Sequence, residues 1–502
     1  MRNYGLVLAG GGAKGAYQIG AWKALVDMGI TFNAIAGTSI GSINGALIAA
    51  GDFEKAHEMW LNISIDKGLK INEELPEPEN LFSKKNWGTL FKEVIKNGGL
   101  DASPAADFIS LYVDEAKVRE SGIPFFAIAV QMTQGVTPRE IGIDEIPEGK
   151  LTDYLMASSN IPLAVGIGPE GEKFLDGGAY DNIPLMTLKK RGYNRIIILD
   201  ISNLKGVGHS MNNTNCEVVH IKPYDTEMLG KFMNLDAEAV EKRIQLGYLD
   251  AKKAFSELLG NIYYFQPETF RGMVQKYGPD TMVSLEKLAY YLSVAPCKIY
   301  TENEFITAVK IAYEEEQKRL QEEAAAAEEK ARETEFESIK TAIKKRFPSK
   351  AANDPIEDEA AAELAEITEV DFETFKDSIK KHFPAKASTE VTEKEPVAEI
   401  TEVKESDFDT IKNIFKKYFP TKVPTETEPE TDEVTVEVAE AKEYESFIES
   451  VRKTFSSFTS QDELTEGKEK ERIRTAIKKR FGQKNPLDEF TDAIAVLDNI
   501  IL

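Results

Sequence analysis

The pentapeptide Gly37-Thr38-Ser39-Ile40-Gly41 constrains the fold of this chain more than any other stretch. It follows the apolar run Phe32 to Ala36, which predicts a buried strand, and it precedes Asn44 to Ala50, whose small and aliphatic residues favour a tightly packed helix. A serine between two glycines at a strand-to-helix junction is typical of a nucleophile elbow, because only glycine tolerates crowded backbone there. We therefore expect Ser39 to project above a sheet edge. Because the same pattern also occurs in ordinary turns, this assignment depends on the rest of the chain.

A second constrained stretch lies at the start of the chain. Leu6 to Ala9 predicts a buried strand, Gly10-Gly11-Gly12-Ala13-Lys14-Gly15 predicts a loop of exposed backbone amides, and Ala16 to Met28 predicts a helix. The apolar face of that helix would carry Ile19, Trp22, Leu25 and Val26. A glycine-rich loop that opens a helix binds negative charge, which here means a dinucleotide, a nucleoside phosphate or the oxyanion of an attacked ester.

The glycine spacing distinguishes among these three ligands. Gly10, Gly12 and Gly15 satisfy the dinucleotide pattern, but the next strand lacks the acidic residue that would hold the ribose. The Walker pattern also fails, because Ala16 follows Gly15 where a lysine is required. An oxyanion hole is the best remaining interpretation, with donors from Gly10, Gly11 and Gly12.

A third stretch, Phe174-Leu175-Asp176-Gly177-Gly178, predicts a strand that ends in a turn. Together with the first two motifs and with ASSNIP at Ala157 to Pro162, it resembles the patatin-like phospholipase family. GGGAKG, GTSIG, ASSNIP and DGG occur in the order and rough spacing of that family, which is more specific than any one of them alone. The resemblance covers about residues 1 to 260, and the C-terminal part of the chain resembles no family that we recognise.

The resemblance implies a three-layer α/β/α domain with a mainly parallel central sheet. It also implies a serine lipid acyl hydrolase that cleaves carboxylic esters of phospholipids or lysophospholipids at a membrane surface, without a metal or another cofactor. Ser39 would be the nucleophile, Asp176 the general base, and the glycine-rich loop the oxyanion hole. Lys14 would either attract the lipid phosphate or orient the loop, and Ser158 and Ser159 would cap or pack near the site.

Three alternatives stay open at this stage. A Ser-Asp-His triad could combine Ser39 with Asp200 and either His209 or His220, although the α/β-hydrolase fold needs several strands before its elbow and one precedes residue 37. The domain could instead be a catalytically inactive or activator-dependent scaffold that presents the C-terminal region to a membrane or protein partner. Acyl transfer to an acceptor other than water is also compatible with the same residues.

Composition narrows the compartment and the partners. Lys and Arg total 61 against 85 Asp and Glu, a net charge of −24 that argues against nucleic-acid binding. The two cysteines, Cys216 and Cys297, are too few for a disulfide framework and suit a reducing cytoplasm. No basic-then-apolar leader and no long apolar run are recognised, so we expect a cytoplasmic protein that meets lipid peripherally; export without a leader stays open.

The first domain is followed by a helical extension, by a repeat region and by a C-terminal tail. We expect Ala237 to Leu258 to close the first domain with a helix, and residues 261 to 332 to form a helical extension. In that extension, Met282 to Leu292 and Phe305 to Tyr313 are amphipathic, and Glu314 to Arg332 predicts a long exposed spacer helix. Within the first domain, Glu73 to Leu100 predicts either a lid over the site or a surface insertion.

Residues 333 to 482 contain an internal repeat, because aromatic residues recur every 36 positions at Phe336, Phe372, Phe408 and Tyr444. Each unit predicts a short amphipathic helix with basic residues at its end, followed by an acidic linker. Such helices need a surface to bury against, so we expect a loose bundle, a disordered tail, or binding to a protein or membrane partner. Residues 483 to 502 would be a C-terminal tail.

Overall fold

The computed structural model describes residues 2–64, 67, 103–131, 137–159, 166–167, 173–202, 216–346, 487 and 490–498. Contacts divide the chain into two compact units, Met1–Ala312 with Thr425–Leu502, and Tyr313–Pro424. The predicted lid or insertion at 73–100 and the repeat units after residue 346 lie outside the described residues.

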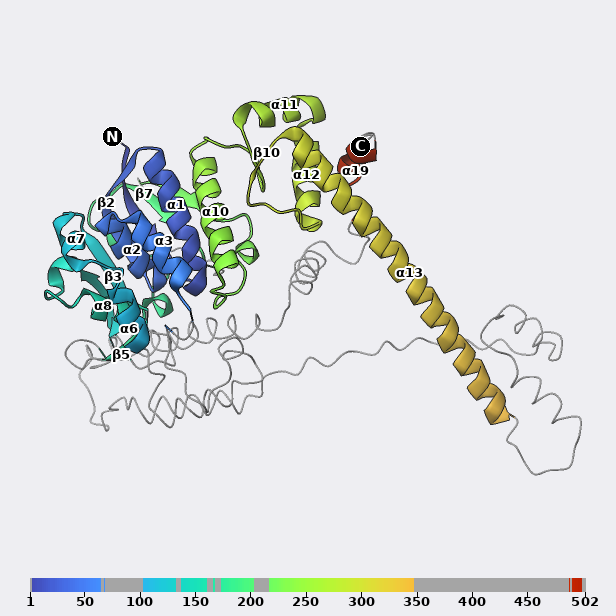
Figure 1. Cartoon of the computed structure of the whole chain (residues 1–502), viewed down its shortest axis with the longest axis horizontal. Coiled ribbons are helices and arrows are strands. Elements are labelled where there is room, and N and C mark those ends of the chain that lie inside the picture. The colour runs from blue at the N-terminus through green and yellow to red at the C-terminus, as the bar shows by residue number, and fades with distance from the viewer. Residues whose placement is uncertain are drawn as a thin grey trace, which may run out of the picture. The chain divides into compact units, whose positions relative to one another are not determined.

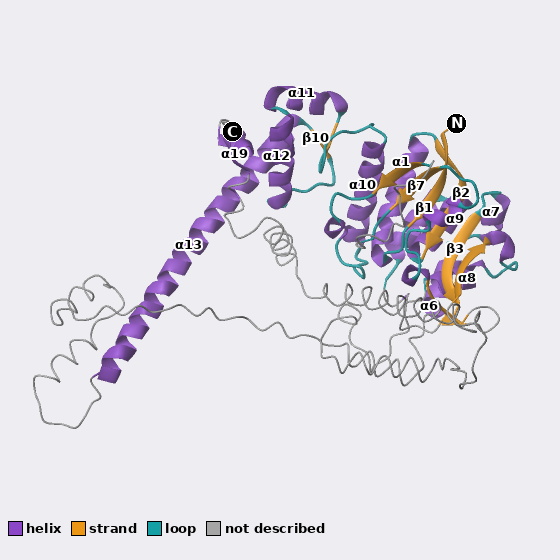
Figure 2. Cartoon of the chain, turned by 180° about the vertical axis from the view of Figure 1, so that it is seen from behind, coloured by secondary structure: helices purple, strands orange, loops and turns teal. Residues whose placement is uncertain are grey.

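A mixed β-sheet forms the centre of the first unit (Figures 1 and 2). Over the described residues it has eight strands in the order β5-β6-β3-β2-β1-β7-β8, with β4 paired to β3. The strands β3, β2, β1, β7 and β8 pair in parallel, whereas β4, β5 and β6 pair antiparallel with their neighbours. Their bounds are β1 Arg2–Leu8, β2 Ile30–Thr38, β3 Phe125–Gln131, β4 Thr137–Gly142, β5 Gly166–Ile167, β6 Lys173–Asp176, β7 Arg195–Leu199 and β8 Glu217–Ile221. The predicted α/β fold with a mainly parallel sheet is confirmed.

Helices cover both faces of this sheet (Figure 2). Successive strand residues alternate between the two layers: Leu6 and Leu8 of β1 join the core beneath α1 and α2, and Val7 joins the core beneath α9. Both faces are therefore apolar, as parallel strands require. The helices of this domain are α1 Ala16–Asp27, α2 Ile40–Ala50, α3 Phe53–Asn62, α6 Ser103–Ser110, α7 Glu115–Glu120, α8 Leu151–Ser158, α9 Leu185–Lys189 and α10 Ala237–Ala254, with short 3₁₀ turns η1 Gly12–Gly15, η3 Ile143–Glu145, η4 Gly177–Ala179 and η6 Thr226–Leu229.

The helix α1 departs in one detail from the predicted apolar face. Ile19, Trp22 and Leu25 are buried, but Val26 is 49% exposed. Val26 lies in the last turn of the helix, where burial ends, and Asp27 beside it is exposed as well. The prediction for Val26 was wrong because periodicity gives the direction of a side chain but not how far the neighbouring elements extend.

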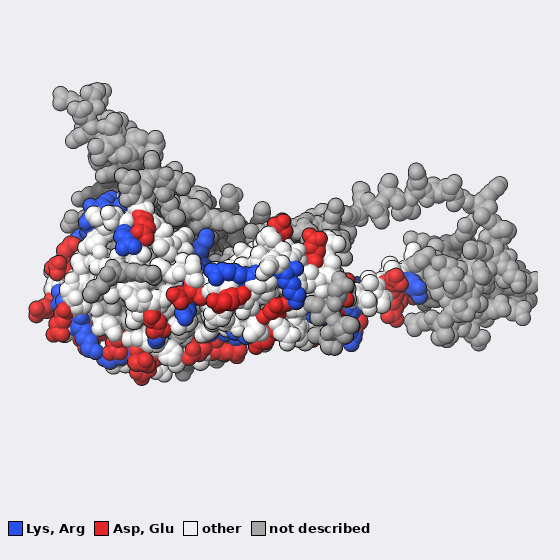
Figure 3. Space-filling view, turned by 90° about the horizontal axis from the view of Figure 1, so that it is seen from above, with Lys and Arg blue, Asp and Glu red and all other residues white. Residues whose placement is uncertain are grey.

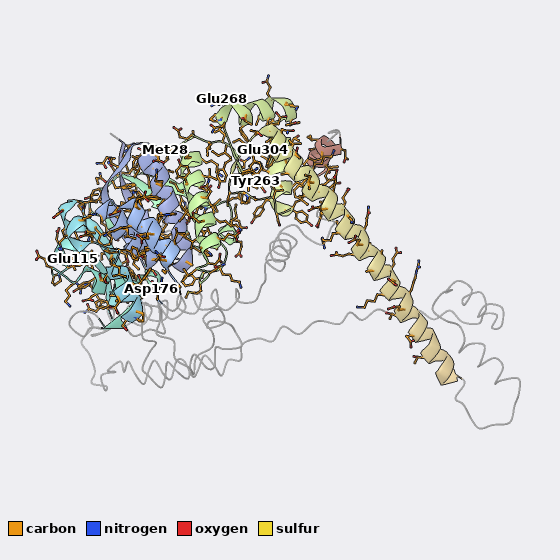
Figure 4. The ribbon with its side chains drawn as sticks, in the orientation of Figure 1. Met28, Glu115, Asp176, Tyr263, Glu268 and Glu304 are labelled. Atoms are coloured by element: carbon orange, nitrogen blue, oxygen red, sulfur yellow. The ribbon has the colours of Figure 1, made fainter. Side chains whose placement is uncertain are left out.

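The connections place several loops at one edge of the sheet. From the central strand β1 the chain proceeds to β2 and β3 on one side, and later to β7 and β8 on the other. The loops after the carboxyl ends of β1, β2 and β7 therefore converge where the strand order reverses, the usual place for a binding site in such sheets. Figure 4 shows Asp176 at the end of this domain away from the start of β1.

A small helical extension with its own core follows α10. It contains β9 Tyr264–Phe265, α11 Pro267–Tyr277, α12 Pro279–Tyr291 and β10 Ile299–Tyr300, and β9 pairs in parallel with β10. Aromatic rings fill its interior: the Phe305 ring lies 5.0 Å from that of Tyr263 and 5.1 Å from that of Phe265. Tyr263 is also labelled in Figure 4. The two predicted amphipathic helices are present here, whereas the short strands and the aromatic core were not predicted.

The last described helix, α19 Thr491–Asp498, packs against α12. The Phe490 ring, just before it, lies 6.1 Å from Tyr291 of α12, and Leu497 is 1% exposed. Part of the segment expected to be a tail is thus a helix that buries apolar side chains on the extension.

A single helix, α13 Glu302–Arg346, joins the first unit to the second. Its first turn brings Phe305 into the aromatic core. The helix then continues through the predicted spacer and crosses the predicted boundary at residue 332 into the first repeat. No helix among the described residues combines the length and the apolar character needed to cross a membrane. On the face drawn in Figure 3, the acidic and basic side chains of the described residues are interspersed.

Candidate active site

Ser39 lies at a sharp turn between β2 and α2. Its backbone has φ 53° and ψ −131°, a conformation that is strained for a residue with a side chain. The flanking glycines are required by close approach: a Cβ on Gly37 would lie 2.2 Å from the Gly41 carbonyl oxygen, and one on Gly41 would lie 2.4 Å from that of Leu8. The turn therefore has the backbone geometry of a nucleophile elbow.

The register of β3 brings Asp176 to this turn. Thr38, the last residue of β2, pairs with Ile128, and Asp176, the last residue of β6, pairs with the next residue, Ala129. Because β4 pairs along the other edge of β3, β2 and β6 share one edge and meet end to end. Two strands that are distant in sequence thus end beside each other, one in a serine and the other in an aspartate.

The side chains of these two residues are in contact. Ser39 Oγ donates a hydrogen bond to Asp176 Oδ2 at 2.6 Å, a short distance typical of a hydroxyl on a carboxylate. The other carboxylate oxygen, Oδ1, accepts the backbone N–H of Gly178 at 2.7 Å. Asp176 therefore keeps a fixed orientation with one oxygen directed at the serine.

The surroundings of Asp176 change its acidity. Burial raises the pKa of its carboxyl from 3.8 to about 6, although the hydrogen bonds from Ser39 and Gly178 act in the opposite direction. A carboxylate with a pKa near 6 accepts a proton more readily than an ordinary surface aspartate, and it is still ionised at neutral pH.

Ser158 fixes the backbone of the elbow. Its hydroxyl accepts the backbone N–H of Ser39 at 3.1 Å and donates to the carbonyl of Ile128 at 2.5 Å. Ser158 is fully buried at the end of α8, and its two hydrogen bonds join the elbow to β3. The structure describes residues 157 to 159 of the ASSNIP motif, and of these Ser158 bonds to the elbow. The Ser159 hydroxyl is buried and has no hydrogen-bond partner among the described residues.

Two backbone amides of the glycine-rich loop, those of Gly10 and Ala13, donate hydrogen bonds that hold the loop in place. The N–H of Gly10 donates to the carbonyl of Asn182 at 3.3 Å, and the N–H of Ala13 donates to the carbonyl of Phe232 at 2.8 Å. Within the described residues, the N–H groups of Gly11 and Gly12 between them have no acceptor in the protein. The Gly10 amide is thus engaged, which limits the candidate oxyanion donors in this loop to Gly11 and Gly12.

Asn182 joins the loop to the Asp176 turn. Its Nδ2 donates to the carbonyl of Gly10 at 3.2 Å, so the side chain and backbone of Asn182 together hold both polar groups of Gly10. The neighbouring Asp181 carbonyl accepts the Thr38 hydroxyl at 2.8 Å, which attaches the same segment to the elbow. Asn182 is 7% exposed.

A buried polar network holds both ends of the same loop. Gln18 Nε2 donates to the carbonyl of Ala9 at 2.8 Å, and Asn44 Nδ2 donates to that of Gly15 at 2.9 Å and to Gln18 Oε1 at 2.8 Å. Trp60 Nε1 completes the network by donating to Asn44 Oδ1 at 3.0 Å. Because Asn44 lies on α2, the helix that follows Ser39 also fixes the loop that faces it.

Neither Lys14 nor His220 lies where a residue in direct contact with the substrate or with Ser39 is expected. Lys14 is 4% exposed, and this burial favours a role in orienting the loop over direct contact with a lipid phosphate. His220 Nε2 lies 3.0 Å from Asp200 Oδ2, and Asp200 also accepts the Ser202 hydroxyl at 2.7 Å. Asp200 and His220 therefore pair with each other while Ser39 pairs with Asp176; His209 lies outside the described residues.

Comparison with known proteins identifies the family of this part of the chain. The model of the patatin-like phospholipase family matches residues 6–189. This part of the chain is a patatin-like phospholipase domain. It contains the glycine-rich loop, the elbow, Ser158 and the Asp176 turn.

Curated relatives match part of the chain. Lysophospholipase NTE1 of Candida glabrata is 27% identical over 264 residues, which cover 50% of this chain and 14% of that protein. Patatin-like phospholipase domain-containing protein 7 of Rattus norvegicus is 28% identical over 209 residues, covering 39% of this chain and 13% of the relative. The chain thus spans about one seventh of the length of these relatives. Among solved structures, VipD from Legionella pneumophila matches with 12% identity and a TM-score of 0.33, covering 62% of this chain and 80% of that one.

Sequence reasoning missed several residues that support the site. Ser158 was expected only to cap or pack, and the contacts of Phe232 and Gln18 were not predicted. Each acts through a partner that is distant along the chain, so local patterns give no sign of the contact. Asn182 follows the DGG turn closely, and that proximity was the one available signal.

Proposed function

We propose that the patatin-like phospholipase domain is a serine lipid acyl hydrolase that cleaves a carboxylic ester of a phospholipid or lysophospholipid. The contact between Ser39 Oγ and Asp176 Oδ2 carries this proposal, because a hydroxyl at a strained turn that donates to a carboxylate of raised pKa suits a nucleophile and its base. The family match and the names of the relatives, lysophospholipase and patatin-like phospholipase, support the substrate class.

The first half-reaction forms an acyl-enzyme. As Ser39 Oγ attacks the ester carbonyl carbon, its proton passes to Asp176 Oδ2, and the carbonyl oxygen becomes an oxyanion that the N–H groups of Gly11 and Gly12 face. When the tetrahedral intermediate collapses, the bond to the alcohol oxygen breaks and Asp176 returns the proton to the leaving alcohol. The acyl group is then esterified to Ser39.

The second half-reaction releases the fatty acid. Water gives a proton to Asp176 and attacks the acyl-enzyme carbonyl, which regenerates the oxyanion in the same loop. Collapse breaks the bond to Ser39 Oγ, and Asp176 returns the proton to that oxygen. A base of this kind contributes about 10²- to 10⁴-fold to the rate, and one oxyanion donor about 10²- to 10³-fold.

The test is release of fatty acid from mixed phospholipid and lysophospholipid vesicles by the full chain, with EDTA present. We expect Ser39→Ala and Asp176→Asn to abolish release, and we expect a matched surface variant, Asp153→Asn, to retain it. Asp153 lies on the first turn of α8 and pairs with Lys150 at the surface, so the variant controls for loss of a carboxylate as such.

Two results would contradict the proposal. Release that survives Ser39→Ala would exclude Ser39 as the nucleophile. A full chain that releases no fatty acid under any lipid composition would favour the alternative of an inactive or activator-dependent scaffold, in which the C-terminal repeats bind a membrane or protein partner.

A further inference from the structure

We propose that Arg243 on α10 is a positioning residue for the oxyanion loop, an inference that rests on the proposed function. Arg243 lies beyond the residues that match the family model and more than 200 positions after the loop. It is 2% exposed and acts through the segment 229–234, which runs from the last residue of η6 towards α10.

The guanidinium of Arg243 holds this segment by its backbone. Nε donates to the carbonyl of Leu229 at 2.6 Å, Nη1 to that of Asn234 at 2.6 Å, and Nη2 to that of Lys231 at 3.3 Å. Three carbonyls of six consecutive residues thus converge on one side chain. The planar, rigid fork of arginine can make all three bonds at once, whereas an ammonium is a single point charge on a flexible stem.

The held segment touches the glycine-rich loop through Phe232. The carbonyl of Phe232 accepts the N–H of Ala13 at 2.8 Å. Its ring lies against the Cα of Gly12, because a Cβ built there would approach three ring carbons at 2.6 to 2.8 Å. Gly12 itself has φ +57°, so glycine is favoured at this position by conformation as well as by space.

These contacts determine which way the candidate oxyanion donors point. A peptide plane is rigid, so the direction of the Gly12 N–H depends on how the residues on either side of it are held. Asn182 fixes the loop on the Gly10 side, and Phe232 fixes it on the Ala13 side. The second anchor depends on Arg243 to hold Phe232 in place, so loss of Arg243 should let the Gly12 amide turn away from the oxyanion position.

The predicted consequence is kinetic. Displacement of a catalytic group by about 1 Å can cost roughly 100-fold in rate, and complete loss of an oxyanion donor about 10²- to 10³-fold. Because Arg243 only supports the loop, we expect Arg243→Met to lower kcat about 10- to 100-fold with KM nearly unchanged. Arg243→Lys should lose less, because it keeps the charge but makes fewer of the bonds.

Arg119 supplies a matched control. It also donates to three backbone carbonyls, those of Ile143, Ile146 and Pro147, and is held by Glu115, which is labelled in Figure 4. Among the described residues, the segment 143–147 makes no backbone hydrogen bond to the glycine-rich loop. Arg119→Met should therefore lower thermal stability without a comparable change in kcat.

The experiment measures kcat and KM of the full-length variants on a soluble p-nitrophenyl ester, the rate at which a fluorophosphonate labels them, and their unfolding temperatures. We expect Arg243→Met and Phe232→Ala to lower kcat and the labelling rate in parallel. Since the two residues act in series, the double variant should be little worse than the poorer single variant.

The possible outcomes separate this inference from the proposed function. If Ser39→Ala abolishes turnover while folded Arg243→Met and Arg243→Lys keep the full kcat, the positioning role is wrong and the hydrolase proposal stands. If kcat falls only in proportion to lost folded protein, as in Arg119→Met, the role of Arg243 is merely structural and the inference fails. If Ser39→Ala retains turnover, the proposed function itself fails.

Discussion

Asp176 and Asp200 lie at strand ends of one sheet and have similar partners, but their acidities differ. Each accepts one serine hydroxyl and one backbone N–H: Asp176 from Ser39 and Gly178, and Asp200 from Ser202 alone. Burial raises the pKa of Asp176 to about 6. Burial also acts to raise the pKa of Asp200, but hydrogen bonds from His220 and Ser202 outweigh it, and the pKa is lowered.

Both aspartates accept a serine hydroxyl, so the serine does not explain the difference between their pKa values. The presence of a histidine beside Asp200, and the absence of one beside Asp176 among the described residues, explain it. Asp200 has His220 at 3.0 Å, which stabilises its charge and leaves it a weak base. Asp176 has no such partner among the described residues, so its charge is destabilised and it gains from accepting a proton. The sequence alone does not distinguish the Ser39–Asp176 pair from the Ser202–Asp200 pair. The structure does so, because His220 accompanies Asp200 and makes it the structural pair, whereas Asp176 is the catalytic candidate.

The largest expected difference is in turnover. Asp176→Asn should lower kcat on a phospholipid by about 10³-fold or more, because the serine then has no base to take its proton. Asp200→Asn should change kcat by less than about threefold and should instead lower the unfolding temperature, since His220 loses its partner. Equal losses of kcat in both variants would remove the distinction between the two aspartates.

The dependence of turnover on pH should follow Asp176. Only the ionised carboxylate can accept a proton, so kcat/KM should fall about tenfold for each pH unit below about 6 and level off above it. In Asp200→Asn the same midpoint should persist. A midpoint near 7 or above that moves with Asp200→Asn would point to the Asp200–His220 pair as the base.

Asp176 and Asp200 should also differ in how turnover responds when a nearby serine hydroxyl is removed. Ser158 supports the elbow that carries Ser39, and Ser202 supports Asp200. Ser158→Ala deletes the acceptor of the Ser39 N–H, so we expect kcat to fall about 10-fold as the elbow loosens, with KM little changed. Ser202→Ala deletes a bond to Asp200 and should leave kcat within about twofold. Steady-state kinetics on one ester, with unfolding temperatures measured in parallel, would compare them.

The smallest predicted effect is on stability and has opposite signs at the two sites. The pKa of Asp176 is higher in the folded protein than in the unfolded chain, so its ionisation costs stability as pH rises from about 4 to 6, by about 3 kcal/mol. Asp176→Asn should therefore unfold about 5 °C higher than the wild type at pH 8, with the gap closing as pH falls to about 4. The pKa of Asp200 is lowered, so its contribution is present above pH 4 and is lost as pH falls further.

An unfolding series from pH 4 to 8 on the wild type, Asp176→Asn and Asp200→Asn would measure these slopes. An Asp176→Asn variant that is less stable than the wild type at pH 8 would mean that the buried charge is not a source of strain. The Asp200→Asn variant serves as the internal control, because it removes a carboxylate from the same sheet.

Much of this site could be predicted from the sequence because its geometry demands glycine. The elbow around Ser39 needs small neighbours at both sides, and the loop at Gly12 needs a positive φ, so both leave a visible pattern. The order of the motifs then led to Asp176. The parallel core strands were predictable because they are apolar on both faces.

The remaining features could not be read from local patterns. Three of them depend on contacts between distant segments of the chain. The Gly10 amide donates to Asn182, the Ser158 hydroxyl accepts the Ser39 amide, and Arg243 holds the segment that contacts Gly12. The antiparallel strand β6 is four residues long, too short for periodicity to reveal its partner. Its pairing with β3 is nevertheless what places Asp176 beside Ser39.

The most direct test of the central claim is covalent labelling of the full-length protein with a fluorophosphonate, followed by mass spectrometry of its peptides. The account predicts one adduct, on Ser39, that forms at least about 100-fold more slowly in Asp176→Asn and at the wild-type rate in Asp200→Asn. An adduct on another residue, or labelling that is unaffected by Asp176→Asn, would contradict the assignment of Ser39 and Asp176 as the reacting pair.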